Sequence, residues 1–509
     1  NPQKNIYQVE QQLSNSAINH IASYLKFGEV LNASVLSDTL NKLIEINDSF
    51  RLVFEHENGN LIQYFKPYSH VEIPITTLEN EDISTFIESF KKYQISLENT
   101  FAFFIVITPT CSYVFFKVHH IISDAWGMTQ VAEQIKEIYN KLLNNEDLSG
   151  YTKPSYMNLI NREQEYLKSP NYDKDSEFWK NYVKQMESSK LFNENNLYDY
   201  SAKRFEYNLD DSLCQKISTF CQELNITEYA FFLAIISVSI NKLYNKSNLV
   251  IGTPFLNRLK KYNDLNSTGL YVSTLPLYVS VSDETDLVSL CKKISNTNFS
   301  IFRHASFPFS KIQKMYNETT HSTTKIFDIG FSYQINKLSN NLNSVDKGFC
   351  NWIFLNQQNQ PLNIHISTVN NYPVVMYDYL TSCLSDNAIQ KINNSVINII
   401  KQIVYEKATE ISKLNILLDT DIKQLQKFNL SGNVQVPNIS VIDIFNEIVQ
   451  KYPTRTALIC GDKTITYQEL IENIAKLKKN EDIPKIWYEI YKYYKSQEKW
   501  NTILEQDLE

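Results

Sequence analysis

The fold of this chain is decided by the stretch Val118-His119-His120-Ile121-Ile122-Ser123-Asp124-Ala125-Trp126-Gly127-Met128. Before it, residues 101–108 and 112–119 are aromatic and β-branched runs separated by Pro109-Thr110-Cys111, which predicts a hairpin of buried strands. After it, apolar residues recur at helical spacing from Val131 to Leu142, so the stretch is predicted to be a strand-to-helix loop. If the strand extends to His120, the imidazole shares a face with Val118, and a neutral ring there is a candidate base.

The paired histidines have two interpretations. A histidine among apolar residues is more often a hydrogen-bonded core residue than a catalyst. Two adjacent histidines at a strand end, an aspartate four residues after the second and a following aromatic residue together favour a functional site. The core interpretation stays as the alternative.

The composition argues against several classes of partner. The 509 residues carry a formal net charge of -7 and the lysines are scattered, so no basic surface for nucleic acid is expected. The seven cysteines are odd in number and widely spaced, without metal-ligand spacing, which predicts reduced thiols in a cytoplasmic protein and no metal site. The longest nearly apolar run, residues 229–240, is far shorter than the roughly 18 residues of a membrane span, and no secretory signal is visible.

The array around the histidines resembles the HHxxxDG signature of the condensation domains of nonribosomal peptide synthetases, which belong to the chloramphenicol-acetyltransferase-like superfamily. One position departs from the signature, because Ala125 stands where the family has glycine. The resemblance implies an α+β fold. Two chloramphenicol-acetyltransferase-like halves, each a mixed sheet flanked by helices, would form a V around a central tunnel.

Further segments resemble motifs of this family and occur in the family's order. They are residues 48–54 (RHExLRTxF), 176–179 (EFW-like), 252–258 and 269–275 (the fifth motif region), 304–309 (HQDxPFE) and 326–333 (FDVxFSY-like). In residues 48–54 only Arg51 and Phe54 match cleanly; in the later motifs Ser273 replaces asparagine, and Ala305 and Ser306 replace two polar residues. The resemblance covers about residues 6–425, and the order of the motifs is more specific than any one of them.

The chain is expected to divide into five parts. They are residues 1–170, the N-terminal half with the His motif; 171–427, the C-terminal half; 428–439, a linker; 440–477, a fragment resembling the start of an adenylation domain; and 478–509, a helical tail of unknown role. The fragment matches the LTYxEL motif of adenylation domains at Thr466–Leu470. The phosphate loop of such enzymes is absent from the sequence, so the fragment is expected to bind no nucleotide.

The resemblance also implies roles for individual residues. His120 would be the catalytic or amine-positioning residue, with His119, Asp124, Trp126, Gly127 and Arg258 supporting the motif. Ser123, Ser273 and His304 are expected to line the tunnel. Asp124 and Arg258 would form a buried ion pair, because a carboxylate in an apolar loop needs a partner and an arginine satisfies it in a bidentate manner.

By the same resemblance, the reaction is amide formation between a carrier-bound acyl or aminoacyl thioester and the amine of a carrier-bound aminoacyl acceptor. The phosphopantetheine arms would come from donor and acceptor carrier proteins, with adjacent synthetase domains as further partners and no cofactor bound by the chain itself. A starter-type domain with an acyl donor is one form of this prediction. A coenzyme A-dependent acyltransferase and a noncatalytic recruitment platform are the alternatives.

Overall fold

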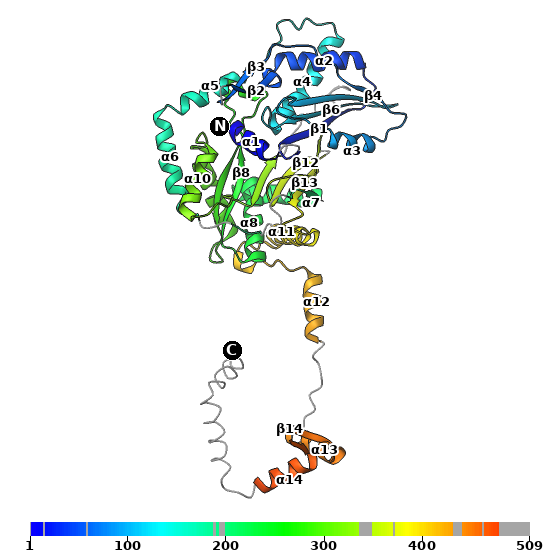
Figure 1. The fold of residues 1–509 in the computed structure, drawn as a ribbon, viewed down its shortest axis with the longest axis vertical. Helices are drawn as coiled ribbons and strands as arrows, with labels where there is room; N and C mark the ends of the chain where they lie inside the picture. Colours follow the sequence, from blue (N-terminus) through cyan, green and yellow to red (C-terminus); the bar gives the residue numbers. More distant parts are fainter. Residues whose placement is uncertain are drawn as a thin grey trace. The chain divides into compact units, whose positions relative to one another are not determined.

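The computed structural model describes residues 2–13, 16–57, 60–186, 190–192, 199–334, 349–369, 372–430, 440–460 and 463–477. The chain divides into two compact units, residues 1–421 and 422–509, and each is described by itself (Figure 1). The expected tail, residues 478–509, lies outside the described residues, as do residues 431–439 of the expected linker.

The first half of the larger unit contains a five-stranded sheet in the order β11-β1-β6-β5-β4. Its strands are β1 (His20–Phe27), β4 (Ile75–Thr77), β5 (Phe101–Ile107), β6 (Ser112–His119) and β11 (Phe349–Ile353). The antiparallel pairing of β5 with β6 confirms the predicted hairpin, and β1 lies antiparallel to β6 on its other side. The strand ends at His119, so the condition on which His120 was expected to share the face of Val118 is not met.

Helices cover both faces of this sheet, which explains why every residue of β6 is buried. On one face, α2 (Ala33–Ile46) and α4 (Ala125–Leu143) pack against Val114, Phe116 and Val118. On the other face, α3 (Ser84–Lys92) packs against Tyr113 and Phe115. The alternation of side chains along β6 therefore feeds two apolar clusters at once. The helix predicted after the histidines is α4.

The second half contains a six-stranded sheet in the order β7-β13-β12-β10-β8-β9. Its strands are β7 (Ala202–Asn208), β8 (Asn248–Phe255), β9 (Ser273–Ser280), β10 (Ile329–Gln334), β12 (Leu362–Val369) and β13 (Tyr372–Leu380). β10 runs parallel to both of its neighbours, whereas the other pairs are antiparallel. The sheet is therefore mixed, as expected for each half.

The core of the second half is built on α8 (Glu228–Tyr244), which is apolar all round and buried over most of its length. α7 (Asp211–Glu223), α9 (Leu287–Phe302) and α11 (Asp386–Glu406) pack beside it. Among the described residues, no single helix is long and apolar enough to cross a membrane; α7 and α8 meet that criterion together, with a bend of 106° between them.

One strand passes between the halves. β11 belongs by sequence to the second half, because it lies between β10 and β12, yet it pairs antiparallel with β1 in the first sheet. The expected boundary between residues 170 and 171 falls at the start of α6, and β11 crosses it in space. The two halves therefore share backbone hydrogen bonds.

The remaining elements connect or flank the two sheets. They are α1 (Pro2–Gln12), η1 (Asp48–Arg51), β2 (Leu52–Glu57), β3 (Asn60–Phe65), α5 (Met157–Tyr166), α6 (Pro170–Val183), η2 (Lys260–Tyr262), η3 (Asp264–Asn266), α10 (Phe309–Thr320) and η5 (Ile411–Lys413). The helix α12 (Asp419–Leu430) runs across the division between the larger and the smaller unit. β2 and β3 form a separate two-stranded ribbon.

The smaller unit contains α13 (Val441–Lys451), the hairpin of β14 (Thr456–Cys460) and β15 (Lys463–Thr466), and α14 (Tyr467–Leu477). Ser440 and Asp443 form a reciprocal capping box at the start of α13. The unit leaves large apolar side chains exposed, with Val441 81% and Ile459 72% accessible. These described elements bury too little apolar surface to form a core of their own.

Candidate active site

The histidine loop begins where β6 ends. The amide of His120 donates to the backbone oxygen of Asn19 at 2.6 Å, and the amide of Ile122 turns back to the oxygen of His119 at 3.0 Å. The first bond holds His120 beside the residue that precedes β1, and the second turns the chain after His119 toward α4. Asp124 then caps α4 by accepting a hydrogen bond from the amide of Gly127 at 2.8 Å.

The imidazole of His120 is suited to accept a proton. His120 is partly exposed, but its Nδ1 is buried and has no hydrogen-bond partner among the described residues. Burial lowers the pKa of His120, although the charge of Asp124 and nearby backbone oxygens oppose this shift. The ring is therefore neutral at neutral pH.

His119 lies in a different environment, although it is the preceding residue. Its side chain is completely buried, and its Nδ1 accepts a hydrogen bond from the amide of Ile121 at 3.1 Å. An imidazole nitrogen that accepts a hydrogen bond carries no proton, so the proton of the neutral ring lies on Nε2. That nitrogen faces the carboxylate of Glu10 at 3.3 Å, an electrostatic contact rather than an aligned hydrogen bond. Each ring nitrogen of His119 thus faces a protein group.

The predicted ion pair between Asp124 and Arg258 is confirmed, with Nη2 of the arginine 2.9 Å from Oδ1 of the aspartate. Asp124 is 1% exposed, and its other oxygen accepts from the amides of Tyr271 and Val272 at 2.9 and 3.0 Å. Together with the bond from Gly127, these contacts fill the carboxylate and bind the histidine loop to the segment before β9.

The expected bidentate geometry of this pair is wrong. Arg258 places only one nitrogen on Asp124, and its guanidinium also donates to the backbone oxygens of Asp264, Ser267 and Gly269 at 2.8, 2.6 and 3.2 Å. It therefore organises the loop between β8 and β9 as well as the carboxylate. Its guanidinium also lies over the ring of Tyr271, 4.0 Å from the centroid.

Gly127, Ser123 and Trp126 fix the loop by packing. A Cβ on Gly127 would lie 2.4 Å from the Oγ of Ser123, so any larger residue would force that hydroxyl to move. Ser123 is 1% exposed, which favours a packing role over the expected tunnel lining. Trp126 donates from Nε1 to the backbone oxygen of Leu265 at 3.0 Å and thereby links α4 to the loop between β8 and β9.

Of the other two residues expected to line the tunnel, Ser273 directly follows Val272, whose amide contacts Asp124, and His304 contacts α6. Ser273 is the first residue of β9 and is partly exposed. His304 lies against α6: its Nδ1 is 2.6 Å from a carboxylate oxygen of Asp175, and its ring stacks on Phe178 with the centroids 3.9 Å apart. Through these contacts, His304 connects α6 to the segment before α10.

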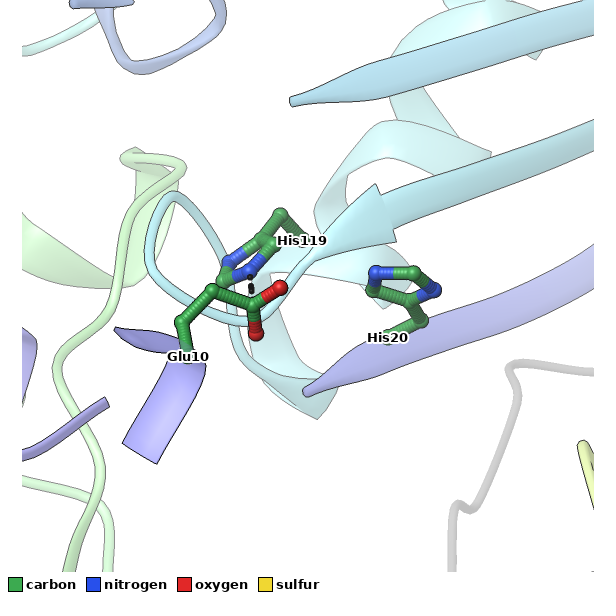
Figure 2. A group of neighbouring side chains, drawn as sticks. All are labelled: Glu10, His20 and His119. Carbon is green, nitrogen blue, oxygen red and sulfur yellow. Dashed lines mark ion pairs between the residues drawn. The ribbon is translucent and has the colours of Figure 1, made fainter. Parts of the chain in front are cut away.

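Sequence reasoning missed the residues that approach the loop from the N-terminus. Figure 2 shows Glu10 of α1 and His20 of β1 gathered around His119. The register of β1 against β6 makes His20 the cross-strand partner of His119. No local pattern connects these residues, and only a prediction of this strand pairing could have found His20.

Glu10, His20 and His119 also have the composition of a metal site, with ligand atoms within 4.8 Å of one another. Two imidazoles and a carboxylate are a common ligand set for Zn²⁺ or Fe²⁺. A histidine that binds metal donates its other N–H to an acceptor, whereas Nδ1 of His119 meets an N–H donor. The nitrogen of His119 facing this cluster therefore carries the proton and has no lone pair to offer. The residues do not fit a metal ion.

Two mixed sheets flanked by helices, joined by a histidine loop and a buried Asp–Arg pair, define the class of two-lobed condensation and acyltransferase folds. The model of the Condensation domain family matches residues 1–426, so the chain belongs to that family. A second match, to the fifth domain of the ATP-dependent helicase/deoxyribonuclease AddB, spans only residues 461–509.

Curated relatives are large synthases. A plipastatin synthase polypeptide of Bacillus subtilis (strain 168) is 26% identical over 484 residues, covering 92% of this chain and 19% of the relative. Surfactin synthase subunit 1 of the same organism is 24% identical over 497 residues, covering 93% of this chain and 14% of the relative. The chain thus spans less than a fifth of the length of these two relatives.

Solved structures share the fold at low sequence identity. The starter condensation domain of rhizomide synthetase in complex with C8-CoA has a TM-score of 0.70 at 16% identity, covering 82% of this chain and 96% of that chain. The first condensation domain of the calcium-dependent antibiotic synthetase, bound to a substrate analogue, has a TM-score of 0.70 at 13% identity, with 82% and 98% covered. The predicted two-lobed α+β fold is confirmed.

Proposed function

We propose that this chain forms an amide bond between an acyl or aminoacyl thioester on a donor carrier protein and the amine of an aminoacyl group on an acceptor carrier protein. The observation that carries the proposal is the state of His120. It is a neutral imidazole with an unpartnered Nδ1, directly after a histidine whose two nitrogens both face protein groups. Membership of the Condensation domain family supports the same reaction.

The chemistry asks little of the protein beyond position and a base. The neutral amine attacks the thioester carbon, the C–S bond breaks, the thiol leaves with a proton and the amide remains. Holding the two groups together supplies effective molarities on the order of 10⁵ M or more. A positioned base adds about 10² to 10⁴ by removing the amine proton, and the lowered pKa of His120 keeps that base unprotonated.

The remaining motif residues would act through position. The carboxylate of Asp124 is filled by protein contacts, and both terminal nitrogens of Arg258 donate to protein oxygens, so neither residue has a role with the substrate in this proposal. His119 likewise faces protein groups on both sides. The phosphopantetheine arms would come from the carrier proteins, so the chain needs no cofactor of its own, and the expected cytoplasmic location suits partners that carry them.

The donor is proposed to be an acyl group, as in a starter-type domain. Two matched proteins support this choice by their names. One is the structure of a starter condensation domain bound to C8-CoA, and the other is subunit 1 of surfactin synthase. The departure at Ala125 from the motif glycine is a sequence feature that favours the same choice.

Residues 440–477 are proposed to be the start of an adenylation domain. The alignment to the plipastatin synthase polypeptide covers 92% of the chain and must extend past residue 426, because residues 1–426 are 84% of the 509 residues. The exposed apolar residues of the smaller unit also support an incomplete domain. Without a phosphate loop, this fragment should bind no nucleotide.

Two other functions follow from matched structures. The matched starter condensation domain is bound to C8-CoA, which supports coenzyme A thioesters as alternative donors. A complex of an X-domain with OxyB from teicoplanin biosynthesis, at a TM-score of 0.70 and 14% identity, shares the fold and keeps a recruitment platform as the noncatalytic alternative. The geometry of His120 favours catalysis over recruitment.

A single-turnover assay with two loaded carrier proteins tests the proposal. Replacing His120 with Ala should lower amide formation at least about a hundredfold. Replacing the exposed His70 with Ala is the matched control and should leave the rate unchanged. Offering acyl-loaded carrier, aminoacyl-loaded carrier and acyl-coenzyme A in parallel identifies the donor. A folded His120→Ala variant with near-normal turnover would rule out the catalytic assignment.

A further inference from the structure

The carboxylate of Glu10 is buried beneath the histidine loop. Glu10 is 8% exposed and lies on α1, with its Oε2 2.8 Å from Nδ2 of Asn19 and 3.3 Å from Nε2 of His119 (Figure 2). Burial by itself raises the pKa of Glu10, but the contacts with His119 and Asn19 outweigh burial, and the pKa lies below its ordinary value. Glu10 is therefore a buried anion at neutral pH.

This anion selects one tautomer of His119. The amide of Ile121 occupies Nδ1, and a negative charge beside Nε2 stabilises the proton on that nitrogen. The two contacts hold the ring from opposite sides. Because the Ile121 amide belongs to the turn that begins at His120, fixing the ring of His119 also fixes the backbone next to His120.

Two more contacts from the N-terminal segment reach the same turn. Gln3 of α1 donates from Nε2 to the backbone oxygen of Ile121 at 2.9 Å, and the backbone oxygen of Asn19 accepts from the amide of His120. We call Gln3, Glu10 and Asn19 the N-terminal clasp. The clasp contacts His119, His120 and Ile121 in succession, and Glu10 is its charged member.

His20 closes the cluster without competing for the carboxylate. Both of its ring nitrogens are buried and have no hydrogen-bond partner among the described residues. Burial lowers its pKa to about 3, the charge of Lys117 adds to the shift and that of Glu10 opposes it, so His20 stays neutral. A neutral His20 leaves the charge of Glu10 directed at His119.

We propose that Glu10 is a positioning residue: its carboxylate holds His119 as the Nε2–H tautomer and thereby sets the position of His120 for the reaction. The inference rests on the proposed function for its kinetic consequence only. The tautomer of His119 is a property of the resting protein and can be measured without a substrate.

The experiment compares Glu10→Ala, Glu10→Gln and the exposed control Glu79→Ala in the full chain. Histidine ¹⁵N chemical shifts report the tautomer of His119, and single-turnover amide formation reports rate and carrier affinity. Glu10→Ala leaves only the Ile121 amide to hold the ring of His119, so the ring should loosen from that amide and both tautomers should be detected. The maximal rate should fall about tenfold to a hundredfold, since a misplaced reacting group costs that much, with little change in the carrier concentration at half-maximal rate. Glu10→Gln keeps an acceptor oxygen and should recover most of the rate.

Several results would overturn this inference. They are an unchanged His119 tautomer in folded Glu10→Ala, an unchanged rate in that variant, or stoichiometric Zn²⁺ binding by the wild-type protein that Glu10→Ala and His20→Ala abolish. If the wild-type protein forms no amide while Glu10→Ala still mixes the tautomers, the proposed reaction fails and the hold of Glu10 on His119 stands.

Discussion

Removing either member of the Asp124–Arg258 pair should destabilise the larger unit severely. Both side chains are essentially inaccessible, with 1% and 0% of their side-chain surface exposed. Asp124→Ala leaves a buried guanidinium without its counter-charge and frees the amides of Gly127, Tyr271 and Val272. Breaking a buried pair costs about 3–5 kcal/mol, a large part of a total stability of about 5–15 kcal/mol.

Arg258→Ala should cost a similar free energy for a different reason. Asp124 would keep three backbone donors, but the oxygens of Asp264, Ser267 and Gly269 would lose theirs. Asp124→Asn should be no more stable than Asp124→Ala, although it keeps the size of the side chain. In either orientation of the amide, its NH₂ would face N–H groups that are themselves donors. Urea unfolding followed by far-ultraviolet circular dichroism measures each loss.

The double replacement Asp124→Ala/Arg258→Ala decides whether the two residues act as a pair. Its loss should be smaller than the sum of the single losses by about 1–3 kcal/mol, because the second change removes an orphaned charge. Lys203→Ala, which breaks an ion pair exposed on both sides, is the control and should change little. Additive losses in this cycle would refute the argument that the pair is the unit of stabilisation.

Two further predictions concern the same region. Gly127→Ala should lower the free energy of unfolding by about 1–3 kcal/mol, because its Cβ meets the Oγ of Ser123. Adding Ser123→Ala should restore part of the lost stability in the same urea assay. Equal losses with and without the Oγ of Ser123 would contradict the steric reason. The pKa of His20 is about 3 in the folded chain and about 6.5 in the unfolded chain. Between these pH values the unfolded state binds one proton more than the folded state, so stability should fall as the pH drops from 6.5 toward 3. The loss should be about 2–3 kcal/mol at pH 4.5. His20→Gln should remove that part of the pH dependence, whereas the exposed control His70→Gln should not.

The elements that follow from local patterns were predictable from the sequence. Alternating and β-branched runs predict β5 and β6, helical spacing predicts α4, and the buried character of α8 follows from its apolar residues on every side. The family resemblance supplied the partner of Asp124 across 134 residues, which no spacing rule could supply.

The rest depended on contacts between distant segments. The amide of His120 is held by the backbone oxygen of Asn19, which lies just before β1 and about 100 residues earlier in the sequence. The guanidinium of Arg258 serves three backbone oxygens because the loop after β8 folds around it, and a residue pattern does not encode which oxygens converge. Glu10 and His20 were missed for the same reason: Glu10 reaches His119 from α1, and His20 reaches it through the pairing of β1 with β6.

The strand β11 has a consequence for how the protein can move. A segment of the second half completes the sheet of the first by pairing along Ala22–Lys26 of β1. If the halves open and close around substrates, they cannot separate at β11 without losing a row of backbone hydrogen bonds. The two halves should therefore hinge at β11, and their relative displacement should grow with distance from it. The same strand makes the halves interdependent in synthesis: a polypeptide ending at residue 170 would leave β1 as an uncovered sheet edge, open to pairing with other chains.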